Sequence, residues 1–400
     1  MTARAPLPAA VRAVVLLCGA VVLVDTVFYA VLSPLLAGYA QSAALDRSAV
    51  GLLVAAYPLG MAAGSVPAGM LASRRGPRLV LVTGALLTAV TCVLFATATS
   101  GSALVGFRLL QGVGGAMSWT AALVWIASVA PAHRRGEVIG RLLALSVVGG
   151  MLGPVVGAAA TVAGTLPVFG AIAALCTTLA VVAARRPAPV LAPSGGWDAA
   201  FALLADRRVR LGLWLTATAG VGFGVVNSSA PLSLGALGLT ALGTSAVFLA
   251  MAGSGALASP WLGRLADRRG RAWVAAVLLL VAGLAMPVAG LTGSLLLLVP
   301  VLVVAATSLE GLYVPGGALI VDGTADADVA GGEILAFTNL VWASSMAVAS
   351  VAAGVTASVV GAAAPYLAVA VAALATLPFL RGLRRATPVA PAAAPGRLSP

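Results

Sequence analysis

The chain has 400 residues, of which 61% are hydrophobic and 8% are charged, and its mean hydropathy is +1.09. Soluble domains average roughly 45–50% apolar and about 25% charged residues, so a soluble globular fold is excluded and lipid must cover much of the apolar surface. The net charge of +12 comes from arginines that cluster at the ends of apolar runs, without interleaved aromatic residues. This distribution indicates membrane topology and argues against nucleic-acid binding.

The apolar runs are long enough to predict the membrane spans directly, because a helix needs about 20 apolar residues to cross a bilayer. We predict twelve transmembrane helices, at 12–37, 48–71, 79–98, 102–127, 138–162, 165–184, 209–234, 242–265, 272–291, 294–320, 332–357 and 361–380. The first run is too long for a signal peptide and carries Asp25 in its middle. We therefore expect it to be a transmembrane helix.

The distribution of arginine predicts the orientation. If the N-terminus is inside, all 23 basic residues except Arg47 and Arg108 fall in cytoplasmic segments. Because cytoplasmic loops carry the excess of basic residues, both termini are predicted to be cytoplasmic. The absence of lysine fits the coding bias of a high-GC bacterium, so we expect a multi-pass protein of the bacterial plasma (inner) membrane.

One arginine-rich cluster occurs twice, about half a chain length apart. The copies read Gly69-Met-Leu-Ala-Ser-Arg-Arg-Gly-Pro-Arg78 and Gly263-Arg-Leu-Ala-Asp-Arg-Arg-Gly-Arg271. Such a repeat in an apolar chain predicts two homologous halves and a secondary transporter. We predict an all-α membrane protein with two pseudo-symmetric six-helix bundles. The predicted segments are a bundle at 1–184, a cytoplasmic linker at 185–208 with a surface helix at 197–204, a bundle at 209–385, and a disordered tail at 386–400.

From Asp25 to about Leu380, the chain resembles the major facilitator superfamily. The repeated cluster is similar to the superfamily's signature loop, whose acid pairs with arginines and a helix end to hold the cytoplasmic side shut. This resemblance implies a gate made of Gly69, Arg74, Arg75, Gly76, Arg78, Gly263, Asp267, Arg268, Gly270 and Arg271. Ser73 replaces the acid in the first copy, so Asp267→Asn should impair transport more than Ser73→Ala.

Two further motifs resemble those of drug/proton antiporters with twelve spans. Arg108-Leu-Leu-Gln111-Gly resembles the RxxQG motif of span four. The second motif, GxxxGPxxG, is matched in span five by Gly149, Gly153, Pro154 and Gly157. Its glycines share one helix face and predict a close helix contact, and Pro154 predicts a bend.

The first and tenth spans are similar to those of vesicular amine transporters as well. Asp25 is followed nine residues later by Pro34, and Glu310, Pro315 and Asp322 have the spacing of the amine transporters' tenth span, where an Asp takes the place of Glu310. The likeness is incomplete, because Asn227 and Asn339 stand where those relatives carry acids. An amine substrate is therefore not inferred.

Asp25 and Glu310 lie near the midplane of their predicted spans. A carboxyl group there is costly and by default marks an ion or substrate pathway. We hypothesise that protonation and substrate binding compete at one or both acids; the alternative is that each is tied to a polar neighbour for helix packing. Arg108 is predicted to tune an acid, orient Gln111 or relay protons, or else to anchor its helix by reaching to the outer surface.

Substrate contacts are predicted from polar and aromatic residues near these acids. The candidates are Phe28, Tyr29, Asn227, Tyr313, Asn339 and Trp342. Aromatic rings beside an acid would suit a lipophilic cation, whereas the alternative for each is ordinary helix packing. Trp119 and Trp125 are interpreted as interface anchors.

These features predict a proton-coupled exporter of small hydrophobic or cationic molecules that works by alternating access, as a monomer in the bilayer. The proton gradient would supply the energy without a cofactor, since the sequence has no nucleotide-binding motif. The alternative is a symporter that imports a small metabolite, because a fold does not decide direction. An enzyme or a channel is disfavoured, since no nucleophile motif, His or Cys cluster, ring of charges or selectivity loop is present.

Overall fold

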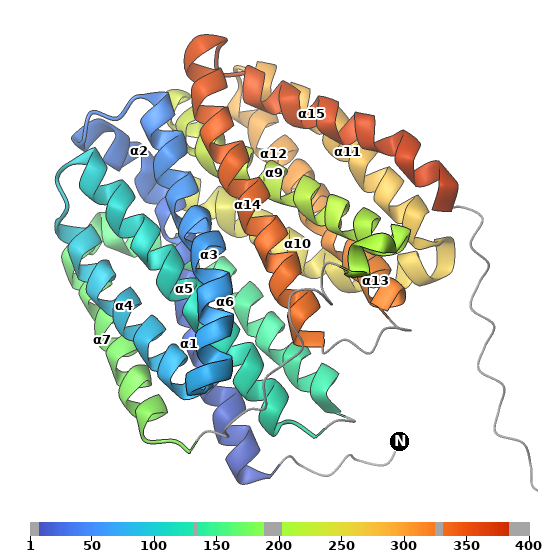
Figure 1. Ribbon diagram of the computed structural model, residues 1–400. Coiled ribbons are helices and arrows are strands. Elements are labelled where there is room, and N and C mark those ends of the chain that lie inside the picture. Colours follow the sequence, from blue (N-terminus) through green and yellow to red (C-terminus); the bar gives the residue numbers. More distant parts are fainter. Residues whose placement is uncertain (1–7, 132–133, 188–201, 325–330, 384–400) are drawn as a thin grey trace, which may run out of the picture.

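The computed structural model describes residues 8–131, 134–187, 202–324 and 331–383, and this part of the chain is almost entirely helical (Figure 1). The first group of helices is α1 (Ala9–Ala30), α2 (Leu32–Ser42), α3 (Arg47–Arg75), α4 (Pro77–Thr97), α5 (Gly101–Val129), α6 (Arg135–Ala163) and α7 (Thr165–Ala184). The second group is α9 (Arg207–Ala236), α10 (Ala241–Arg269), α11 (Arg271–Leu291), α12 (Leu295–Gly311), α13 (Tyr313–Thr324), α14 (Gly331–Val359) and α15 (Ala364–Thr376). Short 3₁₀ segments, η2 (Leu203–Ala205) and η3 (Leu377–Leu383), flank the second group.

The helices confirm the predicted all-α membrane architecture. Within the described residues, eleven helical segments are long and apolar enough to cross a membrane, and a shorter apolar segment, Ala364–Leu380, coincides with the twelfth predicted span. The predicted surface helix at 197–204 lies largely outside the described residues, and its end belongs to the 3₁₀ segment η2. The predicted tail at 386–400 also lies outside them.

The first and tenth predicted spans are each interrupted, which the sequence analysis did not predict. α1 ends at Ala30 and α12 ends at Gly311. Each helix ends four residues before a proline, Pro34 or Pro315. In a helix the N–H of that later residue would bond to the carbonyl group at the helix end, and proline has no N–H to donate. The breaks occur at equivalent places in the two groups and lie beside the candidate site residues.

The repeated arginine-rich cluster forms the same tight connection in both groups. Gly76, with φ 86°, links α3 to α4, and Gly270, with φ 90°, links α10 to α11. Glycine adopts this left-handed backbone without the steric cost that a Cβ atom brings. The glycines of the cluster therefore set the turn between consecutive antiparallel helices.

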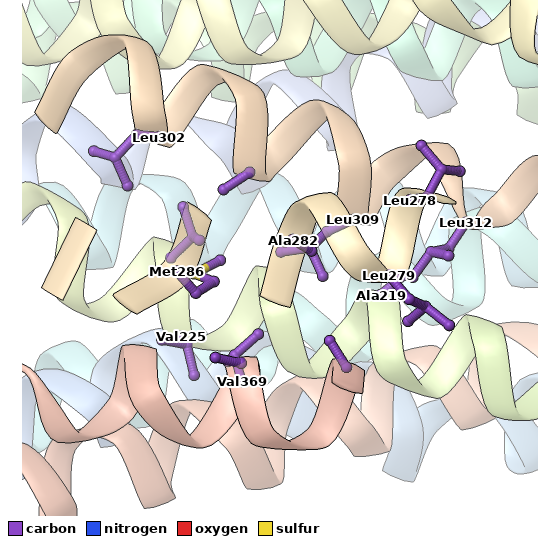
Figure 2. Close-up of a cluster of buried hydrophobic side chains, with 14 of the residues drawn as sticks. Ala219, Val225, Leu278, Leu279, Ala282, Met286, Leu302, Leu309, Leu312 and Val369 are labelled. Atoms are coloured by element: carbon purple, nitrogen blue, oxygen red, sulfur yellow. The ribbon is translucent and has the colours of Figure 1, made fainter. Parts of the chain in front are cut away.

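The buried side chains gather mainly within each group. The buried residues of one cluster all lie between Leu215 and Leu380, and Figure 2 shows part of it, with Met286 of α11 near Val225 of α9 and Val369 of α15. Another cluster lies entirely within α1–α7. The two groups meet extensively where α14 packs against α3 and α10 against α6 (Figure 1). The bundle boundaries at 184 and 209 stay a prediction.

Candidate substrate and proton site

Asp25 is a buried acid with one direct hydroxyl partner. Its side chain in α1 is 4% exposed, and the Tyr57 hydroxyl of α3 donates a 2.8 Å hydrogen bond to its carboxylate. A Cβ atom at Gly115 of α5 would lie 3.0 Å from the Asp25 carboxylate and would collide with the Tyr57 hydroxyl. The glycine therefore gives this pair the room it needs between three helices.

Arg108 is buried against the broken end of α1. Its guanidinium donates to the backbone carbonyls of Phe28 (3.1 Å) and Tyr29, and to the Gln111 side chain (3.1 Å). It also lies over the Tyr57 ring, 5.0 Å from the ring centre, at a distance typical of a cation–π contact. At 2% exposure it does not reach to a membrane surface, so the interpretation as a surface anchor is wrong.

Gln111 extends this polar network to α4. It is fully buried, accepts from Arg108, and donates through its amide to the carbonyl of Thr91 at 3.2 Å. The structure thus brings Arg108 and Gln111 together, as their shared motif predicts. Their role in proton coupling stays a prediction.

A row of five aromatic rings runs from the Asp25 pair across the boundary between the two helix groups. The distances between neighbouring ring centres along it are 5.0, 6.1, 6.5 and 6.4 Å. The row consists of Tyr57, Tyr29, Trp342, Phe223 and Tyr313, in that order. Tyr29, Trp342 and Tyr313 were predicted from the sequence to contact substrate. Their ring contacts join aromatic residues of both helix groups in one continuous row.

Phe28 was also predicted to contact substrate, but the structure places it elsewhere. It is 1% exposed and packs edge-on against Phe169 of α7, with ring centres 5.1 Å apart. It belongs to a hydrophobic core of the first group, so its packing interpretation is the correct one.

Glu310 lies near the other end of the aromatic row, at the end of α12. It is partly buried and, among the residues that the structure describes, has no hydrogen-bond or ion-pair partner. A Cβ atom at Gly255 of α10 would collide with its carboxylate, so a glycine again makes room for the acid. The Tyr313 hydroxyl and the Trp342 indole N–H are both buried without a partner in the described structure. The Tyr313 hydroxyl and the Glu310 carboxyl group, neither of which has a hydrogen-bond partner among the described residues, therefore lie at this break.

The two asparagines have different surroundings. Asn227 of α9 accepts a 3.3 Å hydrogen bond from Ser33 of α2 and donates to the carbonyl of Phe223 at 2.9 Å, so it links the two groups. Asn339 is partly buried in α14, and within the described part of the chain its side chain forms no hydrogen bond. Of the two asparagines, only Asn227 therefore has side-chain hydrogen bonds within the described residues.

The glycine face of α6 packs directly on the first span. Cβ atoms at Gly149, Gly153 and Gly157 would lie 2.6 Å, 2.8 Å and 2.6 Å from backbone carbonyl oxygens of α1 and of the residue that links it to α2. The predicted close contact is confirmed, and its partner is the helix that carries Asp25. Pro154 lies inside α6, which continues without interruption.

The gate predicted from the repeated cluster is only partly assembled. Asp267 is exposed and, in the described structure, forms no ion pair. Arg271 instead pairs with Asp322 of α13 and donates to the Ala318 carbonyl at 3.0 Å. The sequence analysis thus missed the acid that holds Arg271.

The remaining gate residues lie at helix ends. Cβ atoms at Gly69 and Gly263 would meet no neighbour within 4 Å. The side chains of Arg74, Arg75, Arg78 and Arg268 are exposed. Arg78 donates to the carbonyl of Arg186 at 3.2 Å, which joins α4 to the end of α7. Within the described part of the chain, the hydrogen bonds and ion pairs of the gate residues join helices of the same group, and the gate itself stays a prediction.

At the end where Arg47 lies, α3 and α14 are tightly joined. Arg47 donates to the Ala357 carbonyl at 2.9 Å, and the hydroxyls of Ser48 and Ser358 are 3.1 Å apart. A Cβ atom at Gly51 would lie 2.5 Å from the carbonyl oxygen of Ser350. The structure is therefore a state that is closed at this end.

Tyr57 and Trp119 are the site residues that the sequence analysis missed. Tyr57 interrupts an apolar run immediately before Pro58. Its hydroxyl, within a predicted span, was the feature of the sequence that could have marked it as a site residue. Trp119 is partly buried, packs against the cluster that contains Tyr57, and interacts through its side chain with Asp25, whereas Trp125 is fully buried in a core. Neither tryptophan is an interface anchor.

Comparison with known proteins identifies the family. A profile described as Major Facilitator Superfamily matches residues 17–350. The chain belongs to this superfamily. It is therefore a multi-pass membrane protein and a secondary transporter rather than an enzyme.

Individual relatives match parts of this superfamily member. It is 38% identical over 120 residues to the MFS-type transporter ppzB of Metarhizium rileyi (strain RCEF 4871). The aligned region covers 30% of this chain and 24% of ppzB. It is 31% identical over 157 residues to the quinolone resistance protein NorA of Staphylococcus aureus (strain MRSA252), which covers 38% of the chain and 40% of NorA. The matches span less than half of these relatives. The predicted similarity to vesicular amine transporters stays a prediction.

Solved structures confirm the fold along nearly the whole chain. A bacterial homolog of the human lysosomal transporter Spinster, inward-facing and unoccupied, matches with a TM-score of 0.74 at 18% identity, covering 94% of this chain and 95% of the homolog. The E. coli xylose transporter XylE, partially occluded and inward-open, matches with a TM-score of 0.72 at 14% identity, covering 93% and 99%. At these identities the likeness shows the major facilitator fold alone.

Proposed function

We propose that this superfamily member is a proton-coupled exporter of small hydrophobic or cationic molecules. The observation that carries the proposal is the position of Asp25, buried in α1 at one end of an aromatic row that crosses both helix groups. The partial similarity to the quinolone resistance protein NorA supports efflux. The glycine face of α6, which carries the motif that resembles those of antiporters, lies against the same helix.

The chemistry of the site suits competition between a proton and a substrate. A buried carboxylate in an apolar span is costly, so binding of a proton or of a cationic group relieves the cost. The rings of Tyr29 and Trp342 offer faces that attract a lipophilic cation. Glu310, beside the far end of the row, supplies a second carboxyl group without a partner among the described residues. Proton arrival at either acid would weaken the hold on a cationic substrate.

Transport also requires that the closed seam between α3 and α14 opens. In the orientation predicted from the arginines, the Arg47 end faces outside, and this structure is then an inward-facing state. At its Arg47 end the seam consists of hydrogen bonds and close glycine contacts. It can therefore part as the two helix groups rock about the central aromatic row.

Dye uptake into inverted vesicles, whose cytoplasmic face points outward, tests the function when measured with and without an imposed proton gradient. We expect gradient-dependent movement of a cationic dye by the natural protein, and loss of that dependence in Asp25→Asn. Asp46→Asn is the matched control, because Asp46 is an exposed helix cap and Asn caps equally well. Absence of gradient dependence for any cationic or neutral compound would remove the proposal. Gradient-driven uptake of a nutrient into right-side-out vesicles would instead support the symporter.

A further inference from the structure

A small cavity lies beside Asp25, at the junction of α1, α4, α5 and α7. Its volume is about 10 Å³, and its polar lining consists of Asp25, Thr88 and Ser118. The rest of its wall is apolar or weakly polar, with Val21, Val24, Ala85, Cys176 and Leu179. A cavity needs about 10–15 Å³ of this kind of volume, with two to four polar partners, to hold one water molecule. The cavity has the size and the lining for one water.

Thr88 differs from the other threonines of its helix. The hydroxyls of Thr83, Thr91 and Thr97 each donate to a carbonyl three or four residues earlier in α4, which is the usual arrangement in helices. The Thr88 hydroxyl is buried, at 2% exposure, and has no partner in the described structure. Leaving a buried hydroxyl without a hydrogen bond is unfavourable, so Thr88 is expected to bind a partner there.

Two glycines shape the space around these hydroxyls. A Cβ atom at Gly114 of α5 would lie 2.7 Å from the Thr88 hydroxyl oxygen, and one at Gly84 of α4 would lie 2.9 Å from the Ser118 hydroxyl oxygen. Each hydroxyl thus sits opposite a glycine of the neighbouring helix, one turn from its own helix's glycine. Ser118 is 1% exposed, and no described residue hydrogen-bonds its hydroxyl. Thr88 and Ser118 both line the cavity beside Asp25.

We propose that this cavity binds one ordered water that joins the hydroxyls of Thr88 and Ser118 to the Asp25 carboxyl group, and that Thr88 is a positioning residue for proton transfer there. The water accepts from the two hydroxyls and donates to the carboxylate. When Asp25 carries the proton, its O–H donates to the water, which then accepts from one hydroxyl and donates to the oxygen of the other. This inference rests on the proposed proton coupling and adds a further partner for the acid besides Tyr57 and the Trp119 side chain.

The charges around the cavity favour water over a metal cation. The Arg108 guanidinium lies over the ring of Tyr57, the same residue that hydrogen-bonds Asp25, so one positive charge already neighbours this carboxylate. The cavity offers a single carboxylate and two hydroxyls. Sodium usually needs more oxygen ligands than this set provides, as hard cations do.

The test compares two variants that separate the hydroxyl from the shape of the side chain. Thr88→Val keeps the branched shape and loses the hydroxyl, and Thr88→Ser keeps the hydroxyl. In inverted vesicles we expect gradient-driven dye uptake to fall about three- to tenfold in Thr88→Val and to be retained in Thr88→Ser. Dye exchange without a gradient should be unchanged in both. Thr83→Val, on the same helix but away from the cavity, is the control.

Three outcomes would overturn the inference: natural gradient-driven uptake in Thr88→Val, an equal loss in Thr88→Ser, or a parallel loss of gradient-free exchange. Stimulation by sodium that disappears in Thr88→Val would assign the cavity to a cation instead. A high-resolution structure should show density for one water between Thr88 and Asp25, and its absence would also count against the inference. If the natural protein shows no gradient dependence, the proposed function itself fails. A defect confined to Thr88→Val concerns only the cavity, so the two failures are distinguishable.

Discussion

The contact between α6 and α1 offers a sharp test of the packing argument, through the neighbouring substitutions Gly153→Ala and Gly150→Ala. Both glycines lie in the interior of α6, so alanine gains the same helix propensity at each, about 0.5–1 kcal/mol. The two positions differ only in what the new methyl group meets.

At Gly153 the methyl group would collide with the Cβ atom of Ala30 and would lie 2.8 Å from the carbonyl oxygen of Val27. Neither neighbour can rotate away, so α6 must move from α1, at an overpacking cost of about 1–3 kcal/mol. At Gly150 the nearest atom is a methyl carbon of Thr26, 3.9 Å away, which is an ordinary contact. Gly153→Ala should therefore be less stable than Gly150→Ala by about 1–3 kcal/mol.

Thermal unfolding of the two variants in one detergent, followed by tryptophan fluorescence, measures the difference. We expect a lower midpoint for Gly153→Ala than for the natural protein, and an equal or higher midpoint for Gly150→Ala. Equal midpoints for the two variants would refute the argument, because the glycine would then serve no close approach. Dye efflux in the same variants shows whether this contact also supports transport.

Other predictions concern polar contacts. Arg108→Ala should lower stability by about 1–3 kcal/mol, since two buried carbonyls of α1 lose their donor, and an unchanged unfolding midpoint would contradict this. Tyr57→Phe should reduce gradient-driven efflux about tenfold, through loss of a hydrogen bond to a charged group; efflux at the natural rate would show that the bond is dispensable. Asp322→Asn, which frees Arg271, should cost less than about 1 kcal/mol because the pair is partly exposed. Asp267→Asn should leave the unfolding midpoint unchanged. If Asp267→Asn lowered the midpoint more than Asp322→Asn, the stabilising ion pair would instead involve Asp267.

Several features of the fold could be predicted because they depend on local rules. In a bilayer each span must satisfy its own backbone hydrogen bonds and needs about 20 apolar residues, so the helices match the predicted runs within a few residues. The turns at Gly76 and Gly270 follow from glycine's tolerance of positive φ. The shared face of Gly149, Gly153 and Gly157 follows from helical periodicity.

The breaks at Ala30 and Gly311 were predictable in principle but were missed. Their prolines stand four residues later, yet Pro58 and Pro154 lie inside uninterrupted helices. A proline by itself therefore does not decide whether a helix stops.

The sequence by itself determined the number and limits of the spans, the two-fold repeat, and the candidate acids and arginine. Only the tertiary structure decided which neighbours these groups have. Phe28 turns into a core while the next residue, Tyr29, joins the aromatic row. Arg271 meets Asp322 rather than Asp267. Adjacent residues on a helix point about 100° apart, so their partners depend on how each helix is rotated and packed, which involves contacts between distant parts of the chain.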